Sequence, residues 1–293
     1  MTAIFQTLVD GVFAAAVFTA VAVAFNVVYR SGRVFNIAQG EMIVLSTFMT
    51  LTFVSWGLSP WLAMGAGIVL MGVLGIVVER LVLRRLVGQP ELSSFMATLG
   101  LLLVIQGAST VVFGLAPQKF PPLLGTASFE VAGVFVKQSA LIGVLAIALL
   151  VWALFLLFNR TKVGLGMTAV AESHQVARSL GINVKLSMAI SWVIAGALSG
   201  FVTLLYASGR TVTPEISSVA FVALPVVLLA GLESIGGVAI AALIVGVGQA
   251  AAARWFDPYT EGGASLIFPF ALMLVLLLIR PQGLFGWKRV ERL

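Results

Sequence analysis

The stretch IFQTLVDGVFAAAVFTAVAVAFNVVY, residues 4–29, carries one charged side chain, Asp10. A helix of this length is sufficient to cross the roughly 30 Å hydrocarbon core of a bilayer. A strand of a membrane barrel would be about 10 residues long and would alternate polar with apolar side chains. A secretory signal begins with a positive region, whereas no basic residue precedes Arg30. We therefore predict that residues 4–29 form a retained membrane-spanning helix.

The rest of the chain repeats this pattern. Of its 293 residues, 60% are hydrophobic and 10% are charged, and the mean hydropathy is +1.12. Soluble domains carry about 25% charged residues, so the bilayer is the expected solvent. We predict an all-α membrane protein, a polytopic bundle of about eight or nine segments forming a single transmembrane domain over residues 1–293, with the pair described next as the candidate for broken or re-entrant helices. The segments lie near 4–29, 37–56, 61–79, 93–115, 139–158, 186–207, 219–232, 237–253 and 264–279.

The seventh and eighth of these runs are short and meet at GLESIGG, residues 231–237. They are either two complete spans or the two halves of a broken, re-entrant element, which transporters use to expose backbone groups to a solute. An odd number of crossings in the whole chain agrees better with the charge distribution, so we favour two complete crossings for residues 219–253.

Lys and Arg residues divide unevenly between the two sides of such a bundle. If the N-terminus lies outside and the spans alternate, only Lys119, Lys137, Arg210 and Arg254 fall outside. The other basic residues then fall inside, as the positive-inside rule requires. The charges predict a periplasmic N-terminus and a cytoplasmic C-terminus in an inner membrane.

Several function classes lack their sequence features here. The chain has no cysteine and one histidine, and it contains no Walker A sequence and no grouping typical of a catalytic site. We expect no metal, no cofactor, no enzymatic activity and no nucleic-acid partner. Any energy for transport has to come from a partner or from a gradient.

Two polar segments stand out between the apolar runs. Residues 117–138 contain SFEV and VFVK around an Ala-Gly pair, which predicts a periplasmic hairpin. Residues 160–185 are predicted to form a cytoplasmic loop with an amphipathic helix from Met167 to Leu180, ended by Gly181. This helix is either an interfacial anchor or a docking element, and its small residues favour docking.

The stretch AVAESHQVARSLGINV, residues 169–184, resembles the cytoplasmic coupling loop of branched-chain amino acid ABC transporter permeases. FNVVYRSGRVFNIAQGE, ERLVLRRL, FMATLGLLLVIQG, LLAGLESIGG and RPQGLFG resemble the same family in the same order, over nearly the whole chain and closer to its LivH-type subunit. The resemblance implies a second permease subunit of related sequence, two cytoplasmic ATPase subunits and a periplasmic substrate-binding protein. It also implies ATPase coupling through Ala171, Glu172, Ser173, His174, Val176, Ala177, Arg178, Leu180 and Gly181.

Polar residues within the apolar runs are candidates for a translocation path or gate, because such groups are costly in a membrane. The candidates are Asn26, Asn36, Gln39, Gly40, Glu41, Thr98, Gln106, Glu233 and Ser234. The alternative for each is a hydrogen bond between helices, and this alternative is favoured for Gln106 taken singly. A solvated carboxylate at an inner turn explains Glu233 equally well.

The motif FNIAQGE, residues 35–41, has two interpretations. Asn36 and Gln39 have the spacing of a capping box, and Glu41 would lie in the first helical turn, where the helix dipole favours an acid. In that case the motif is a cap at the headgroups. We favour the other interpretation, in which the chain dips into the membrane before the helix begins and Glu41 faces the path.

The sequence therefore predicts a permease subunit of an ATP-driven importer for branched-chain or related amino acids. A stand-alone secondary transporter or channel is the competing class. Within the same family, urea, amides or aromatic acids are competing substrates.

Overall fold

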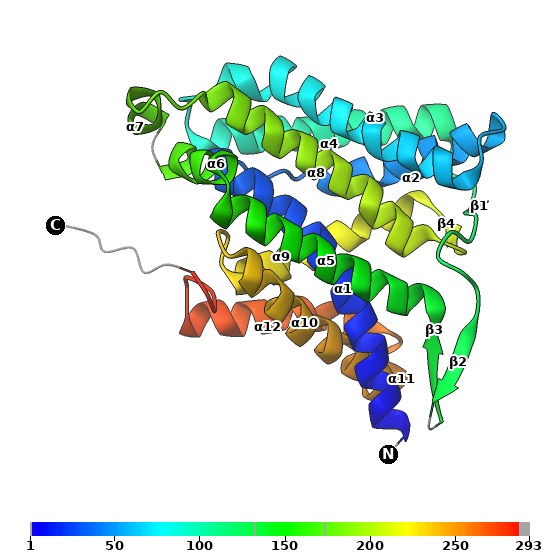
Figure 1. Ribbon diagram of the computed structural model, residues 1–293. Helices are drawn as coiled ribbons and strands as arrows, with labels where there is room; N and C mark the ends of the chain where they lie inside the picture. The colour runs from blue at the N-terminus through cyan, green and yellow to red at the C-terminus, as the bar shows by residue number, and fades with distance from the viewer. Residues whose placement is uncertain (1, 132, 173, 287–293) are drawn as a thin grey trace.

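The chain is a bundle of helices, shown as a computed structural model in Figure 1, which describes residues 2–131, 133–172 and 174–286. Each predicted apolar run coincides with a helix, which confirms the all-α membrane fold. These helices are α1 (Thr2–Gly32), α2 (Gln39–Ser55), α3 (Pro60–Leu81), α4 (Glu91–Phe113), α5 (Gln138–Arg160), α8 (Val184–Ala207), α9 (Ser218–Ala230), α10 (Ile235–Trp255) and α12 (Gly263–Ile279).

Within the described residues, six helices are long and apolar enough to cross a bilayer: α1, α3 with the short helix η1 (Leu83–Leu86), α4, α5, α8 and α10. The interpretation of 219–253 as two short halves is wrong for its second part, because α10 has 21 residues. Only α9 is short, with 13 residues, and the 3-10 turn η2 (Pro214–Ser217) leads into it. Ser234 starts α10 early by capping it, which the hydropathy pattern alone did not reveal.

Helix α1 forms the centre of the bundle and packs against α8, α9 and α10. It is apolar around its whole circumference, as expected of a helix enclosed by others, and its residues 20–28 are all buried. Glycines allow its close approach to α10. A Cβ added to Gly246 would lie 2.6 Å from the Gly11 carbonyl oxygen, so these two backbones touch.

Helices α3 and α8 form a second close pair. A Cβ at Gly75 would collide with the Trp192 carbonyl, one at Gly196 with the Met71 carbonyl, and one at Gly200 would lie 2.7 Å from the Ile68 side chain. The small-residue pair Gly196 and Gly200 thus brings the helix backbones together, which is the usual device where no hydrophobic effect drives association.

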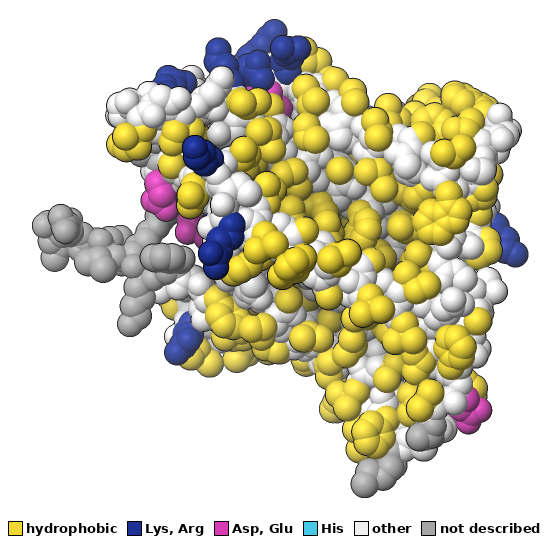
Figure 2. Space-filling view, viewed as in Figure 1, with side chains coloured by type: hydrophobic (Ala, Val, Ile, Leu, Met, Phe, Trp, Pro, Cys, Tyr) yellow, Lys and Arg dark blue, Asp and Glu magenta, His cyan; other side chains and the backbone are white. Residues whose placement is uncertain are grey.

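The two ends of the bundle carry different additions (Figure 1). At one end lie α6 (Lys162–Glu172) and α7 (His174–Ser179). At the other end the strands β2 (Ser128–Val131) and β3 (Val134–Lys137) form an antiparallel hairpin over SFEV and VFVK. Figure 2 shows Lys and Arg side chains gathered at the α6 and α7 end.

Two further short elements complete the hairpin end. Strand β1 (Gln118–Lys119) pairs with β4 (Thr211–Val212), which ties the loop after α4 to the loop after α8. Helix α11 (Asp257–Thr260) connects α10 to α12.

Candidate functional site: the start of α2 and the α6 and α7 end

The chain turns back into the bundle after α1. Arg33 follows α1 with a left-handed φ of 52°, and the ring of Phe35 then stacks on the ring of Phe25 with centroids 5.3 Å apart. Phe25 lies about two turns before Gly32, the end of α1, which is about 10 Å inward at 1.5 Å of rise per residue. Helix α2 therefore begins inside the bundle rather than level with the end of α1.

The predicted capping box does not form. Helix α2 begins at Gln39 with Ala38 as its N-cap, and no side chain bonds the free amides of its first turn. The Asn36 amide instead donates to the Gln39 side-chain oxygen at 2.9 Å. The two side chains pair with each other because both are fully buried and a buried amide needs a partner.

Gln39 also fixes the start of α2 to the middle of α8. Its amide donates to the Ser199 hydroxyl at 2.8 Å and to the Ala195 carbonyl at 3.2 Å. Lower on the same interface the hydroxyls of Thr47 and Thr203 lie 3.1 Å apart. Both contacts are buried, so Gln39 acts here as an interhelical bond.

The turn before α2 is held from two further sides. The Thr98 hydroxyl of α4 donates to the Phe35 carbonyl at 2.8 Å. On the opposite side Gly40 faces η2, where an added Cβ would lie 2.6 Å from the Ser217 carbonyl oxygen and 3.0 Å from the Ala220 Cβ. Only glycine at position 40 allows α2 and α9 to begin this close together.

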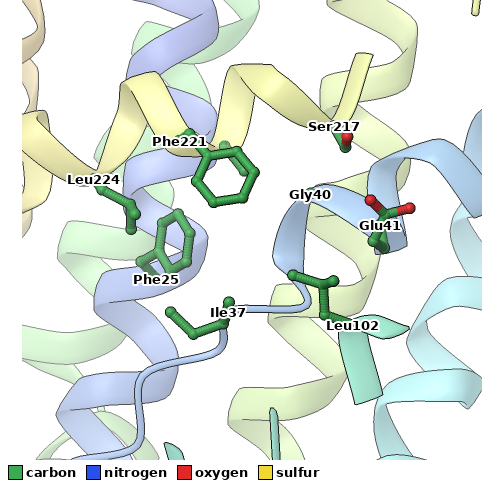
Figure 3. Close-up of a pocket in the computed structure, with 9 residues that line it drawn as sticks. Phe25, Ile37, Gly40, Glu41, Leu102, Ser217, Phe221 and Leu224 are labelled. Atoms are coloured by element: carbon green, nitrogen blue, oxygen red, sulfur yellow. The ribbon is translucent and has the colours of Figure 1, made fainter. Parts of the chain in front are cut away.

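Glu41 lies at the pocket that this approach creates (Figure 3). It is 4% exposed, and its carboxylate accepts a hydrogen bond from the Ser217 hydroxyl. Apolar side chains line the rest of the pocket, from α1, α4 and α9: Phe25, Leu102, Phe221 and Leu224. The pocket has a volume of about 10 Å³, room for about one water molecule, so a solute could reach Glu41 only if α2 and α9 moved apart.

The GLESIGG turn lies at the α6 end of α1. The Asn26 amide donates to the Leu232 carbonyl at 3.0 Å, and the Ser234 hydroxyl accepts from the Gly237 amide at 3.0 Å and so caps α10. Glu233 is half-buried at the mouth of a cavity of about 860 Å³, close enough to Arg30 to interact electrostatically. Glu233 and Glu41 thus line different cavities, and Glu233 is a partly solvated carboxylate at a turn.

The motif RPQGLFG, residues 280–286, encloses this turn, a role that the sequence reasoning missed. The Leu284 amide donates to the Leu229 carbonyl at 2.7 Å, and the Phe285 amide donates to the Ala230 carbonyl at 3.1 Å. These carbonyls end α9 and lack partners within their own helix. The two glycines of the motif were the available signal, since Gly283 has φ 76° and packs against the Leu228 carbonyl.

The structure differs here from the predicted helix Met167 to Leu180. The helical segment begins earlier, because α6 spans Lys162–Glu172, and α7 spans His174–Ser179. Ser173 and the side chain of His174 lie outside the described residues. A helix could begin at 162 because the Thr161 hydroxyl accepts from the Gly164 amide at 3.1 Å.

One face of α6 and α7 packs on the bundle and the other is open. Val170 and Ala177 are buried in a cluster with Val184 and Met188. Leu180 is 70% exposed, and Glu172, Arg178 and Gly181 are exposed beside it, with Gly181 in a left-handed turn at φ 77°. Ala171 is half-buried and Val176 is exposed.

Two polar contacts join α6 to the end of α1. The Arg33 guanidinium lies 3.6 Å from the Glu172 carboxylate, and the Arg30 guanidinium donates to the Thr168 hydroxyl at 3.1 Å. Arg30 also lies over the Phe158 ring, 4.8 Å from its centroid. Helix α6, with its open outer face, is therefore joined to Arg33, the residue that starts the turn into α2.

Gln106 lies away from these groups. It is exposed on α4, on the outer side of the bundle, and lines none of the pockets described here. The nine path candidates thus form two clusters and one outlier. Asn36, Gln39, Gly40, Glu41 and Thr98 surround the start of α2, whereas Asn26, Glu233 and Ser234 surround the GLESIGG turn.

Comparisons with known proteins agree with these features. Residues 7–277 match the family model described as the branched-chain amino acid transport system / permease component. The chain is 26% identical over 98% of its length to the high-affinity branched-chain amino acid transport system permease protein BraD of Pseudomonas aeruginosa, covering 97% of that protein.

Two further relatives are similar over most of their length. The probable branched-chain amino acid transport permease protein LivH of Methanocaldococcus jannaschii is 25% identical, over 93% of this chain and 90% of that protein. The high-affinity LivH permease protein of Escherichia coli K12 is 24% identical, over 98% and 97%. Because the family model spans most of the chain, this multi-pass membrane protein belongs to the branched-chain amino acid transport system permease family.

Proposed function

We propose that the chain is the permease subunit of an ATP-binding-cassette importer and forms part of the path for branched-chain or related amino acids. The names of its relatives support the substrate class. The observation that carries the mechanism is the open face of α6 and α7, joined to the turn before α2 through Arg33 and Glu172. A helix fixed at one side and open at the other can transmit the movement of a docked partner.

The partners follow from this arrangement. One of two cytoplasmic ATPase subunits binds the face that contains Glu172, Arg178 and Leu180, and the other binds the second permease subunit. A second, related permease subunit completes the path, and a periplasmic protein delivers the solute at the hairpin end. The basic residues at the α6 and α7 end support a cytoplasmic position for that end.

The gate in this proposal is the start of α2. Movement of α6 displaces Arg33, and the short segment behind Arg33 passes that displacement to Gly40 and Glu41. The Glu41 carboxylate then exchanges its Ser217 partner for the ammonium group of the solute. The hydrogen bonds of Asn36, Gln39 and Thr98 make this segment rigid, so that it passes the displacement on to the pocket.

The test uses the complete complex, with the companion permease, both ATPases and the binding protein, purified through a tag on this chain. Leu180→Asp places a charge on the open face and should remove most of the ATPase from the purified complex. Val131→Asp is the matched control, since Val131 is 63% exposed at the opposite end, and it should retain the ATPase. Normal ATPase recovery with Leu180→Asp contradicts the proposed docking face.

Transport by the same complex in liposomes tests the class of function. Uptake of labelled leucine should require ATP, both ATPases and the binding protein. Uptake by this chain alone along an ion gradient would instead identify a secondary transporter. Thermal shifts of the binding protein with leucine, isoleucine and valine, against urea, amides and aromatic acids, identify the solute class.

A further inference from the structure

A second cavity, of about 550 Å³, lies at the hairpin end of the bundle, far from the start of α2. Helices α1, α5 and α8 form its walls, and the β2 and β3 hairpin covers part of its mouth. Nothing in the proposed transport mechanism uses it. Its lining nevertheless changes from polar and charged residues to apolar residues along its length.

The polarity of the α1 wall changes with depth. Gln6, Asp10, Phe13 and Val17 all line the cavity, at the spacing of one helix face. From Gln6 to Val17 the wall descends about 16 Å at 1.5 Å per residue. It begins with polar and acidic groups and ends with apolar ones, so the cavity has a charged mouth and an apolar floor.

Two cations stand at the mouth. Lys137 ends β3 and Arg210 follows α8, and both line the cavity. The Arg210 guanidinium lies over the Tyr206 ring, 5.1 Å from its centroid, which holds it at the cavity wall. These are two of only four basic residues that the charge pattern assigns to this end, so their convergence is not a general property of the surface.

The mouth is built by specific bonds rather than left open by loose packing. The Gln6 side chain accepts from the Phe135 amide at 2.9 Å and donates to the Phe135 carbonyl at 3.1 Å, which fixes the hairpin to α1. The same Gln6 amide donates to the Asp10 carboxylate at 3.0 Å. The acid is thereby held in the lining of the cavity that Lys137 and Arg210 also line.

We propose that this cavity binds one phospholipid from the leaflet at the hairpin end. Its phosphodiester lies between Lys137 and Arg210, an amine of the head group lies near Asp10, and an acyl chain follows the α1 wall past Ala14 to Val17. Charge-assisted bonds to a phosphate suit these two cations. The depth favours a lipid over a free amino acid, which would occupy only the upper part of a wall about 16 Å deep.

Native mass spectrometry of the full-length chain, titrated with palmitoyl-oleoyl phosphatidylethanolamine in mild detergent, tests this proposal. The double variant Lys137→Ala/Arg210→Ala should bind the first lipid at least about tenfold more weakly, the effect of losing one charge-assisted bond. Ala14→Phe fills the groove and should weaken it similarly. The control Lys119→Ala/Arg254→Ala removes two cations from the same end, outside the cavity, and should stay within about twofold of the wild type.

Four outcomes would overturn the proposal. An equal loss in the control means general charge attraction, and unchanged binding in both cavity variants means that the lipid binds elsewhere. Loss with the cation variant but none with the groove variant means that the head group binds at the mouth without an acyl chain in the groove. Ala140→Phe fills the same groove from α5 and replaces the first filler if gel filtration shows that variant to be unfolded. Displacement of the lipid by millimolar leucine would identify a solute site instead.

Discussion

Gly40→Ala tests the contact on which the proposed gate depends. The new methyl group would lie 2.6 Å from the Ser217 carbonyl oxygen and 3.0 Å from the Ala220 Cβ. The first of these neighbours is backbone, which cannot rotate out of the way. The start of α2 must therefore move away from η2, and this movement lengthens the hydrogen bond between Glu41 and Ser217.

The magnitude follows from two opposing effects. Inserting a methyl group into a packed site costs about 1–3 kcal/mol, and a rigid backbone neighbour places this site in the upper part of that range. Replacing glycine by alanine in a helix returns up to about 1 kcal/mol. The net loss of about 1–2 kcal/mol corresponds to a fall in Tm of about 2–3 °C for a chain of this size.

Thermal unfolding in detergent, followed by circular dichroism, measures this fall. Gly65→Ala in α3 is the matched control, because nothing lies within 4 Å of a Cβ at that position. It should leave Tm unchanged or raise it slightly. If Gly40→Ala melts at or above the wild-type temperature, as Gly65→Ala should, the close approach of α2 and η2 is not a feature of the protein.

Three further predictions concern other parts of the structure. Gln39→Leu should lower the free energy of unfolding by about 1–3 kcal/mol, because it removes the bonds to Ser199 and Ala195 and takes the oxygen acceptor from the buried Asn36 amide, and chemical denaturation measures this. Arg33→Glu or Glu172→Arg should each reduce transport-coupled ATP hydrolysis, and the double exchange should restore part of it by restoring the pair. All three variants should remain folded, because an exposed pair contributes under about 1 kcal/mol to stability. Hydrogen bonds from Ser265 lower the pKa of Asp257, so the stabilisation is present above the ordinary carboxyl pKa and is lost as pH falls through the lower folded-state value. The difference in Tm between the wild type and Asp257→Ala should therefore become smaller between about pH 7 and about pH 3. A difference that stays constant would contradict the hydrogen bond from Ser265 to Asp257 as the stabilising contact.

The contact between Arg33 and Glu172 is a matter of position more than of strength. At 3.6 Å, with side chains 24% and 66% exposed, it is a weak surface pair. Arg33 stands at a left-handed turn directly before the segment that enters the bundle. In the proposed mechanism a displacement of Arg33 is passed on because that segment is bonded to both α4 and α8.

The sequence alone located the apolar helices, because a bilayer requires about 20 apolar residues for each crossing, but it did not show which of them are long enough to cross. The segments SFEV and VFVK around an Ala-Gly pair likewise predicted the β2 and β3 hairpin. The short α9 and full-length α10 were not distinguished, because the cap at Ser234 depends on one side-chain bond rather than on hydropathy.

Only the tertiary structure decided what the motif FNIAQGE does. Local chemistry allowed a capping box, and nothing in the motif itself revealed that Phe35 would stack on Phe25 or that Gln39 would find its partners on α8, some 160 positions away. Burial removed water as a competing partner, so Asn36 paired with Gln39 and Gln39 paired with α8, and neither side chain caps its own helix. Apolar pattern is a local property and can be read along the chain, whereas the partner of a buried polar group depends on which helices become neighbours.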